Sequence, residues 1–330
     1  MSSSEVVIGV DAGGSNSRVA CADLFGCLQA FVLAGGISPT HNTDGQTTLQ
    51  SAIRQALTSA GRRPEDVRAL VLGCAGIDDE TALGWAREYT NVPGVNCPSL
   101  HLNDAEVAHA GAFSGQPGVI AVSGTGSIVW ARTDRGEVVR NYDFAHYAHS
   151  AARHLAYNAV YGLLTESVSS QDAPLERATL HHFGAQDLDE LQRRVQRCSQ
   201  LDEKERNRAY GKLGPAVTLA AEQGSPIARA ACDTALAELT TGIALVAGAF
   251  QTRPVPVVLV GSVLNAPYCS TRLHELLKAR VAIRCTLREA QLAPVGGAVL
   301  LALRLAGVDP GSAVLQGFPS QLRPGRVASG

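Results

Sequence analysis

The sequence predicts an α/β protein of two domains, and three observations carry this prediction. The chain has 330 residues, enough for two domains that each bury a core. Short apolar runs rich in β-branched residues alternate with segments of helical periodicity. The order of these runs near the N-terminus recurs from residue 118 on, as a repeat of about 110 residues, far longer than a solenoid period. The repeat therefore indicates two domains of similar topology.

The first half is expected to open with three short strands joined by tight turns, over 5–11, 17–24 and 28–34. Helix and strand then alternate, because apolar spacing of three to four residues gives way to continuous apolar runs. The expected order is a helix over 45–61, a strand over 67–76, a helix over 79–90, a strand over 99–104 and a further helix.

The second half repeats the three strands and then departs from the pattern. Strands are expected over 118–124, 127–132 and 137–141, followed by a long helical stretch over about 147–251. After it come a strand over 256–262, a helix over 268–279, a strand over 281–285 and a helix over 293–307. We expect domains at 1–115 and 116–307, with an irregular tail rich in Pro and Gly at 308–330.

Composition excludes several classes of function. A formal net charge of -2 predicts no nucleic-acid partner. The eight cysteines form no C-x-x-C pair, so neither a zinc framework nor a disulfide scaffold is indicated. The N-terminus lacks a basic segment followed by an apolar one, and no apolar run is expected to approach the ~18 residues of a membrane span. We expect a cytoplasmic protein with no membrane partner.

Two glycine-rich hairpins occupy the same place in the two repeats. Asp11-Ala-Gly-Gly-Ser-Asn-Ser17 joins the first two strands, and Ser123-Gly-Thr-Gly-Ser127 joins their counterparts. Glycine lets the backbone approach a ligand closely, so such hairpins present N–H groups to phosphate. Each alone also fits an ordinary turn, but the symmetric pair favours a nucleotide clamp. Neither is a Rossmann or Walker motif, because strand rather than helix follows the loop.

Two carboxylates stand at strand ends. Asp11 beside phosphates would hold Mg²⁺ through water, because that ion keeps an octahedral shell and uses few carboxylates. Its alternative role is a turn cap that binds its own loop amides. Asp104 precedes an Ala-rich helix and would serve either as its N-cap or as a general base that accepts the proton of a hydroxyl attacking a γ-phosphate.

These residues resemble a known family. "GVDAGGSNSR", "LGCAGID", "LNDAEVAHAGA", "AVSGTGSIVWA", "VVLVGSV" and "APVGGAVLLA" are similar, in this order, to six motifs of the sugar kinase and actin-like ATPase superfamily. Within it they resemble the BadF/BadG/BcrA/BcrD-type ATPases, which include N-acetylglucosamine and glucosamine kinases. The resemblance covers about residues 5–306, and its strength lies in the order of the motifs rather than in any one of them.

The resemblance implies two ribonuclease-H-like domains with ATP and Mg²⁺ in a cleft between them, phosphorylation of an amino-sugar hydroxyl, and a homodimer. It implies roles for individual residues: Asp104 as catalytic base, Asp11 as the Mg²⁺ holder through water, and Gly13, Gly14, Ser15, Asn16, Gly124, Thr125 and Gly126 as phosphate contacts. Adenosine contacts are expected at Gly261, Ser262 and Gly297. Contacts to the sugar substrate are expected at His41, Asn42, Gly76, Asn103, Ser127 and His149.

The chain departs from the family where a G-D-E-G-S segment usually shapes the sugar site. It has Tyr147-Ala-His-Ser-Ala151 there, with no carboxylate. His146 and His149 would share a helical face, and we interpret them as part of a changed pocket or a helix cap rather than as a metal site. The charged segment 201–213 is interpreted as a solvated helix face.

Two alternative functions follow from the same residues. One is an ATPase that acts on a partner protein, as the activators of 2-hydroxyacyl-CoA dehydratases do. Cys74 and Cys97 form no evident iron–sulfur motif, which argues against it. The other is a nucleotide- or sugar-binding sensor with reduced kinase activity, suggested by the missing G-D-E-G-S segment.

Overall fold

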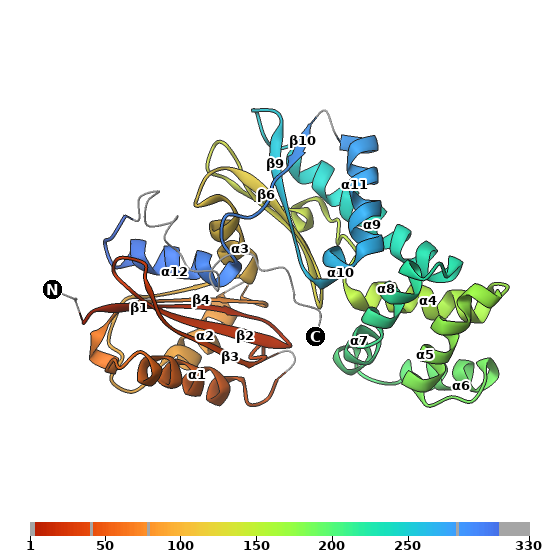
Figure 1. Ribbon diagram of the computed structural model, residues 1–330, viewed down its shortest axis with the longest axis horizontal. Coiled ribbons are helices and arrows are strands. Elements are labelled where there is room, and N and C mark those ends of the chain that lie inside the picture. Colours follow the sequence, from red (N-terminus) through yellow and green to blue (C-terminus); the bar gives the residue numbers. More distant parts are fainter. Residues whose placement is uncertain (1–3, 40–41, 78–79, 282–283, 310–330) are drawn as a thin grey trace. The chain divides into compact units, whose positions relative to one another are not determined.

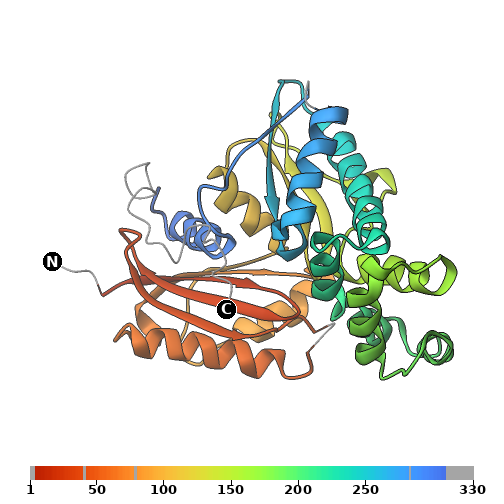
Figure 2. The same ribbon diagram turned by 45° about the vertical axis from the view of Figure 1, so that its right-hand side comes forward.

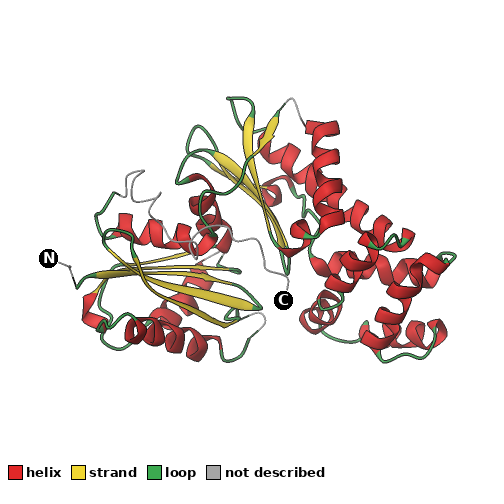
Figure 3. Ribbon diagram, viewed as in Figure 1, coloured by secondary structure: helices red, strands yellow, loops and turns green. Residues whose placement is uncertain are grey.

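The computed structural model describes residues 4–39, 42–77, 80–281 and 284–309 (Figure 1). It divides into two compact units: the chain up to Pro117 together with the segment from Glu289, and Gly118–Arg288. Each unit contains one five-stranded sheet with helices packed on it (Figure 3). The prediction of an α/β protein built from two similar domains is confirmed.

The first sheet has the strand order β3-β2-β1-β4-β5. β1 (Val6–Ala12) pairs antiparallel with β2 (Asn16–Asp23), which pairs antiparallel with β3 (Leu28–Gly35). β4 (Val67–Cys74) lies parallel to β1, and β5 (Ser99–Leu102) lies parallel to β4. Tight turns make the antiparallel connections, whereas each parallel pair needs a crossover through a helix.

Helices cover both faces of this sheet because successive side chains of β1 point to opposite faces. Ile8 packs in the core shared with α1 and α2, whereas Val7 packs in the core shared with α3 and α12. The helices of this unit are α1 (Gly45–Ser59), the short 3₁₀ turn η1 (Pro64–Asp66), α2 (Glu80–Thr90), α3 (Asp104–Phe113) and α12 (Pro294–Leu305).

The last helix, α12, packs in the first unit, although the sequence places it in a second domain over 116–307. Two glycines permit the contact. A Cβ on Gly297 would lie 2.0 Å from the carbonyl oxygen of Val107 in α3, and one on Gly9 of β1 would lie 2.5 Å from the backbone nitrogen of Val299. Backbone therefore meets backbone here, and the chain returns to the first unit near residue 289. Of the expected tail at 308–330, residues 310–330 lie outside the described part.

The second sheet has the order β10-β9-β6-β7-β8, which repeats that of the first. β6 (Gly118–Ser123), β7 (Ser127–Arg132) and β8 (Val138–Arg140) form an antiparallel meander. β9 (Val255–Val260) is parallel to β6, and β10 (Cys285–Leu287) is parallel to β9. The internal repeat is thus confirmed, while the last strand lies slightly later than the expected 281–285.

The long helical stretch is a series of separate helices, seen together in Figure 2 as one group of green ribbons continuous with α9. It begins at residue 152 rather than near 147, because Ala145 and Ala148 have left-handed backbone angles, φ 53° and 44°, that a helix cannot contain. The elements of the stretch are α4 (Ala152–Thr165), η3 (Ser170–Asp172), α5 (Ala173–Phe183), α6 (Leu188–Cys198), α7 (Glu203–Gly211), α8 (Gly214–Glu222) and α9 (Pro226–Ala247). The short turn η2 (Asn141–Phe144) precedes it, and α10 (Ser262–Asn265) and α11 (Pro267–Val281) follow β9.

The helix α9 corrects one expectation about membranes. It has 22 residues and is long and apolar enough to cross a bilayer by length and composition, contrary to the expectation that no apolar run approaches that length. Its most apolar stretch is 56% buried inside the protein. Residues such as Leu236, Leu239 and Ile243 belong to the core of the second unit, which accounts for its apolar character.

Candidate active site

Two carboxylates of the first unit lie at the carboxyl ends of its parallel strands. Strand pairing sets Asp11 of β1 opposite Gly73 of β4, and Gly73 opposite Leu102 of β5. Asp104 follows two residues after Leu102, at the first turn of α3. The register therefore brings both carboxylates to one edge of the sheet, where open α/β sheets bind their ligands.

The thiol of Cys74 lies close to both carboxylates. It ends β4 and is fully buried. Burial raises the pKa of the Cys74 thiol, and the negative charges of Asp104 and Asp11 raise it further. The charges of Asp11 and Asp104 thus both act on the end of β4, which agrees with the shared sheet edge that the strand register gives them. The thiol itself stays protonated and unreactive near neutral pH.

Asn103, not Asp104, caps helix α3. Its side-chain oxygen accepts a hydrogen bond from the backbone N–H of Ala105 at 2.9 Å, and Glu106 accepts one from the backbone N–H of Asn103 at 3.3 Å. Asp104 is the first residue of the helix and lies half-buried. The helix N-terminus favours its negative charge. The capping role considered for Asp104 is therefore filled by its neighbour.

Asp11 is buried and paired with a cation. Arg18, its partner across the hairpin, donates to Oδ2 at 3.1 Å. Burial raises the pKa of Asp11, and the charge and hydrogen bond of Arg18 oppose that rise. The remaining oxygen, Oδ1, has no hydrogen bond to another described residue. No group of three or more His, Cys, Asp and Glu residues in the described ranges could hold a metal by itself. One carboxylate next to phosphate fits the way Mg²⁺ is usually bound.

The first hairpin is held from one side by the segment that follows β3. The carbonyl of Gly13 accepts from the backbone N–H of Ile37 at 3.0 Å, and the carbonyl of Gly14 accepts from Asn42 Nδ2 at 3.1 Å. In a trans peptide the next N–H points opposite to the carbonyl. The N–H groups of Gly14 and Ser15 therefore turn away from this support, an arrangement suited to binding an anion.

Gly36 makes this support possible. A Cβ on Gly36 would lie 2.1 Å from the carbonyl oxygen of Gly14, so only glycine lets the segment pass this close beneath the hairpin. Asn42, expected to contact the substrate, instead uses its amide nitrogen on the carbonyls of Gly14 and Ser38. The structure thus gives Asn42 a supporting position. His41 lies outside the described residues.

The second hairpin is built in the same way inside the second unit. The carbonyl of Gly124 accepts from the backbone N–H of Ala152 at 2.8 Å, and that of Thr125 accepts from Arg153 Nη1 at 3.2 Å. The N–H groups of Thr125 and Gly126 consequently turn away from helix α4. Ser123 Oγ donates to the carbonyl of Ser150 at 2.5 Å and fixes the base of the hairpin.

Gly261 and Ser262 adjoin this second hairpin, whereas Gly297 belongs to the first unit. Gly261 has φ 119°, and a Cβ there would lie 2.1 Å from the carbonyl oxygen of Ser123. A Cβ on Gly124 would lie 3.5 Å from the backbone nitrogen of Ser262. Gly297, also expected at the adenosine, is packed on α3 in the first unit, and this packing is the reason for glycine at that position.

The remaining expected substrate residues are divided between the two units. Gly76, with φ 90°, turns the chain after β4 at the edge that carries Asp11 and Asp104, and Asn103 lies at the same edge. Ser127 opens β7 and its carbonyl accepts from Tyr142 Oη at 2.8 Å. His149 is exposed in the irregular segment before α4.

A row of rings occupies the segment from Tyr142 to His154, which contains the stretch expected to differ from the family pattern. The ring centroids of Tyr142 and Tyr147 are 5.9 Å apart, those of Tyr147 and His149 6.1 Å, and those of His149 and His154 4.8 Å. Burial lowers the pKa of His154 to about 4, and Arg153 and His149 add to this effect. His154 is therefore neutral at physiological pH. The expected shared helical face of His146 and His149 is wrong, because both precede α4.

Sequence reasoning missed the two arginines that flank these hairpins, Arg18 and Arg153. The pairing of Arg18 with Asp11 could have been predicted from the hairpin. The two residues stand at equal distances from the turn and therefore lie opposite each other on the paired strands. Nothing in the local pattern pointed to Arg153, whose contact with Thr125 spans 28 residues. Burial lowers the pKa of Arg153.

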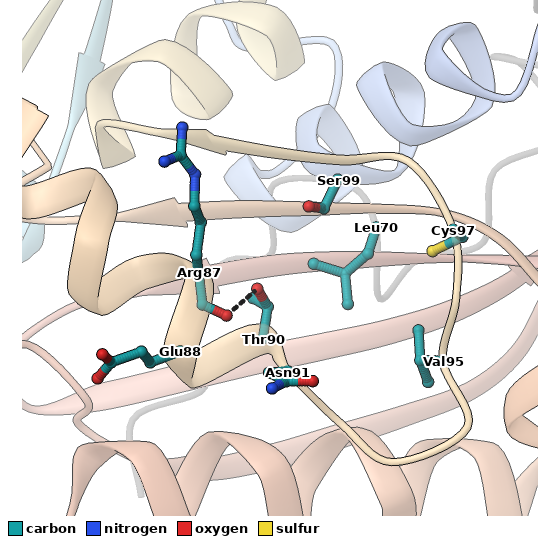
Figure 4. A pocket seen from close by; sticks show the side chains of 8 residues that line it. All are labelled: Leu70, Arg87, Glu88, Thr90, Asn91, Val95, Cys97 and Ser99. Carbon is teal, nitrogen blue, oxygen red and sulfur yellow. Dashed lines mark hydrogen bonds between the residues drawn. The ribbon is translucent and has the colours of Figure 1, made fainter.

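A cavity of about 350 Å³ in the first unit lies away from this site (Figure 4). Its lining includes Leu70 of β4 and Ser99, the first residue of β5, whereas Asp104 follows the last residue of that strand. The cavity therefore opens at the amino end of β5. Thr90 in its wall donates to the carbonyl of Arg87 at 3.2 Å (Figure 4) and lies 2.7 Å from His101 Nε2, so its polar atoms are already used.

Comparisons with known proteins agree with this architecture. An N-acetylmuramic acid/N-acetylglucosamine kinase of Clostridium acetobutylicum is 30% identical over 142 residues, which is 42% of this chain and 46% of that kinase. The matched stretch thus spans about half of the relative.

Solved structures show the same fold at lower identity. A candidate N-acetylglucosamine kinase from Chromobacterium violaceum has a TM-score of 0.70 at 23% identity, covering 90% of this chain and 99% of its own. A ROK family glucokinase from Streptomyces griseus, solved with glucose and AMPPNP, has a TM-score of 0.56 at 18% identity, covering 91% and 99%.

The family comparison spans most of the chain. The sequence pattern of the BadF/BadG/BcrA/BcrD ATPase family matches residues 8–302. This range contains both hairpins and both strand-end carboxylates described above. The protein belongs to the BadF/BadG/BcrA/BcrD ATPase family.

Proposed function

We propose that the protein is an ATP-dependent kinase that phosphorylates an amino sugar, N-acetylglucosamine or glucosamine, with Asp104 as the general base. The observation that carries this proposal is the position of Asp104. It opens α3 beside Asp11, and Asn103 has taken over the capping of the helix. The family match and the Clostridium acetobutylicum kinase, whose name gives two amino sugars, support the choice of acceptor.

The proposed reaction is a single in-line transfer. A sugar hydroxyl attacks the γ-phosphorus of ATP, its proton passes to the carboxylate of Asp104, and the bond from the γ-phosphorus to the bridging oxygen breaks to release ADP. The N–H groups of the two hairpins would bind phosphate oxygens. Their fixed orientation costs no reorganisation during the reaction, because the supporting hydrogen bonds already hold each loop.

Asp11 would hold Mg²⁺ through coordinated water, and the ion would supply positive charge that neutralises the phosphates. Arg18 has a second effect on this site. By donating to Oδ2 it opposes the rise in the pKa of Asp11 that burial causes and so favours the carboxylate. Asp11 and Arg18 therefore act as a pair.

The acceptor would contact Ser127 and His149 in the second unit. The row of rings from Tyr142 to His154 offers apolar faces for a sugar, and Tyr142 is hydrogen-bonded to Ser127 at the end of the hairpin. This segment replaces the carboxylate-bearing G-D-E-G-S that the resemblance predicts.

We further propose a cytoplasmic homodimer. The eight free cysteines are consistent with the cytoplasmic location, and light scattering of the purified protein tests the dimer.

The test is a screen of ATP consumption with amino sugars, N-acetylated sugars, hexoses and anhydrosugars, followed by mass spectrometry of the products. The proposal predicts ADP formation that depends on an amino sugar and a product heavier by one phosphoryl group. Nucleotide binding with no product from any sugar would contradict it and would favour the sensor. ATP hydrolysis without a sugar product would favour an ATPase that acts on a partner.

A further inference from the structure

A second cavity, of about 630 Å³, lies in the helical part of the second unit. Three tyrosines from α4 and α7 form one part of its wall: Tyr157, Tyr161 and Tyr210. Tyr157 and Tyr210 are stacked with centroids 3.9 Å apart, and Tyr161 follows one turn later with 49% of its surface exposed. The cavity thus has an aromatic wall that is fixed by packing and partly open to solvent.

The polar side chains of this cavity are arranged in a chain of hydrogen bonds. Tyr157 Oη donates to Asn207 Oδ1 at 3.2 Å, and Asn207 Nδ2 donates to Glu203 Oε1 at 3.5 Å. Arg206 Nη1 donates to the carbonyls of Ser199 and Leu201 at 3.4 and 3.3 Å. The lining therefore offers both hydrogen-bond donors and hydrogen-bond acceptors. Its two charged residues, Glu203 and Arg206, carry opposite charges.

This chemistry fits a sugar ring better than an anion or an apolar ligand. Hydroxyl groups both donate and accept hydrogen bonds, so they match a lining of amide, carboxylate and guanidinium groups. The apolar face of a pyranose matches an exposed tyrosine ring, which presents a large and rigid surface. A binding pocket that is partly aromatic with a few fixed polar groups is typical of small-molecule sites.

Helix α4 connects this cavity to the second hairpin. Arg153, which donates to Thr125 in the hairpin, precedes Tyr157 by four residues and Tyr161 by eight. Residues four apart lie on the same helical face, at a rise of about 6 Å. Arg153 also interacts electrostatically with Tyr157 and Glu203 of the cavity. A continuous face thus runs from the hairpin into the cavity.

We propose that this cavity is a second carbohydrate sub-site, which binds the sugar ring next to the one that is phosphorylated. An acceptor of at least two linked amino-sugar rings then binds more tightly than the free monosaccharide, because it fills both sites. This inference rests on the proposed kinase function. It also adds a binding role to the segment 201–213, most of whose charged residues are exposed as the sequence predicts, because Glu203, Arg206 and Asn207 line the cavity.

The test compares N-acetylglucosamine with its β-1,4-linked dimer, N,N′-diacetylchitobiose, as acceptors for the whole protein. We expect kcat/KM to be at least about tenfold higher for the dimer, which corresponds to about 1.4 kcal/mol of added binding. Tyr161→Ala removes this advantage and leaves kcat/KM for the monosaccharide unchanged. Tyr161→Phe keeps it, because the ring remains. Tyr161 is half exposed, so neither change threatens the fold.

Phe25→Ala is the matched control, since Phe25 is an aromatic residue 65% exposed in the other unit. It changes kcat/KM for neither acceptor. Equal kcat/KM for both acceptors, with no effect of Tyr161→Ala, overturns the sub-site and leaves the kinase intact. Phosphorylation of neither sugar overturns the proposed function. Calorimetric titration with the dimer alone then decides separately on the cavity: dimer binding that Tyr161→Ala weakens supports the sub-site, and no binding overturns it.

Discussion

The two hairpins share one construction and differ in charge. In each, two successive carbonyls accept hydrogen bonds from supporting residues, Ile37 and Asn42 for the first and Ala152 and Arg153 for the second. The first follows a strand that carries a buried carboxylate, Asp11, whereas the second follows a strand that ends with the hydroxyl of Ser123. The comparison teaches that the repeated topology supplies the same backbone support in both units, while under the proposed function one residue near the strand end decides whether a cation is bound.

The same contrast extends along the two sheet edges. Asp104 adds a second carboxylate to the edge of the first unit, beside Asp11. In the second unit, Ser123 ends β6, the counterpart of β1, and Gly261 follows β9, the counterpart of β4. We therefore expect substitutions at the first edge to abolish chemistry, and substitutions at the second to weaken phosphate binding or the fold.

The largest effect is expected from Asp104→Asn. The amide has nearly the same size but accepts no proton, so kcat should fall about 10³-fold, within the range typical of general acid–base catalysis. Nucleotide affinity should stay within about twofold, because the hairpins are untouched. A coupled assay for ADP measures the rate, and fluorescence titration with a labelled nucleotide measures binding. Turnover near that of the wild type would remove Asp104 from the mechanism.

Gly261→Ala tests the second hairpin through its support. The substitution places a Cβ 2.1 Å from the carbonyl oxygen of Ser123 and strains a residue at φ 119°, so the free energy of unfolding should fall by about 3 kcal/mol. Gly84→Ala is the matched control, because Gly84 lies inside α2 with no atom within 4 Å of a new Cβ. It should stabilise the protein by about 0.5–1 kcal/mol. Urea unfolding of both variants measures these changes, and equal midpoints would contradict the account.

Asp11→Asn should lower the activity and raise the melting temperature. Without a carboxylate the reaction should slow about 100-fold and need more Mg²⁺. Because burial raises the pKa of Asp11, the folded state holds the proton more tightly than the unfolded state. Ionisation of Asp11 as the pH rises above its ordinary value of 3.8 therefore costs stability. The Asn variant should melt higher than the wild type at pH 7 without Mg²⁺, and the difference should shrink toward pH 4.

The control for this prediction is Arg18→Gln, which removes the cation and keeps the carboxylate. It should make burial of Asp11 more costly and lower the melting temperature at pH 7. If Asp11→Asn melts below the wild type at pH 7, the carboxylate is a stabilising turn cap, and its assignment to Mg²⁺ loses its physical basis.

The smallest effect is expected from Ser123→Ala. It removes one hydrogen bond to the carbonyl of Ser150, worth about 1 kcal/mol. KM for ATP should rise about fivefold with little change in kcat, because the hairpin loosens but no catalytic group is lost. A change confined to kcat would show instead that Ser123 takes part in the chemical step.

The sequence predicted the topology well, because local patterns determine it. Alternation and tight glycine turns define the two meanders, and continuous apolar runs define the buried parallel strands. The return of α12 to the first unit could not be predicted, since it depends on the contact of Gly297 with the backbone of α3, almost 190 residues earlier in the chain. The start of α4 was missed because left-handed Ala145 and Ala148 carry no propensity signal.

The sequence predicted those parts of the candidate site that lie at the ends of recognisable strands. Asp11 and Asp104 stand at strand ends that the apolar runs identify. The hydrogen bonds of Asn42 could not be predicted, because a side-chain amide can bind either a sugar hydroxyl or a backbone carbonyl. Only the fold places the carbonyl of Gly14 next to its amide nitrogen. The cavity between α4 and α7 could not be predicted for a similar reason: it depends on how the two helices pack, while the charged residues of α7 are mostly exposed, as predicted.

The central claim is that the edge bearing Asp11 and Asp104 transfers phosphate to an amino sugar. The most direct measurement is mass spectrometry of N-acetylglucosamine and glucosamine incubated with ATP, Mg²⁺ and either wild type or Asp104→Asn. The account predicts a sugar product heavier by one phosphoryl group, formed with one ADP per sugar by the wild type and absent with the variant. Release of free phosphate with both sugars unchanged, or equal product from both proteins, would contradict it.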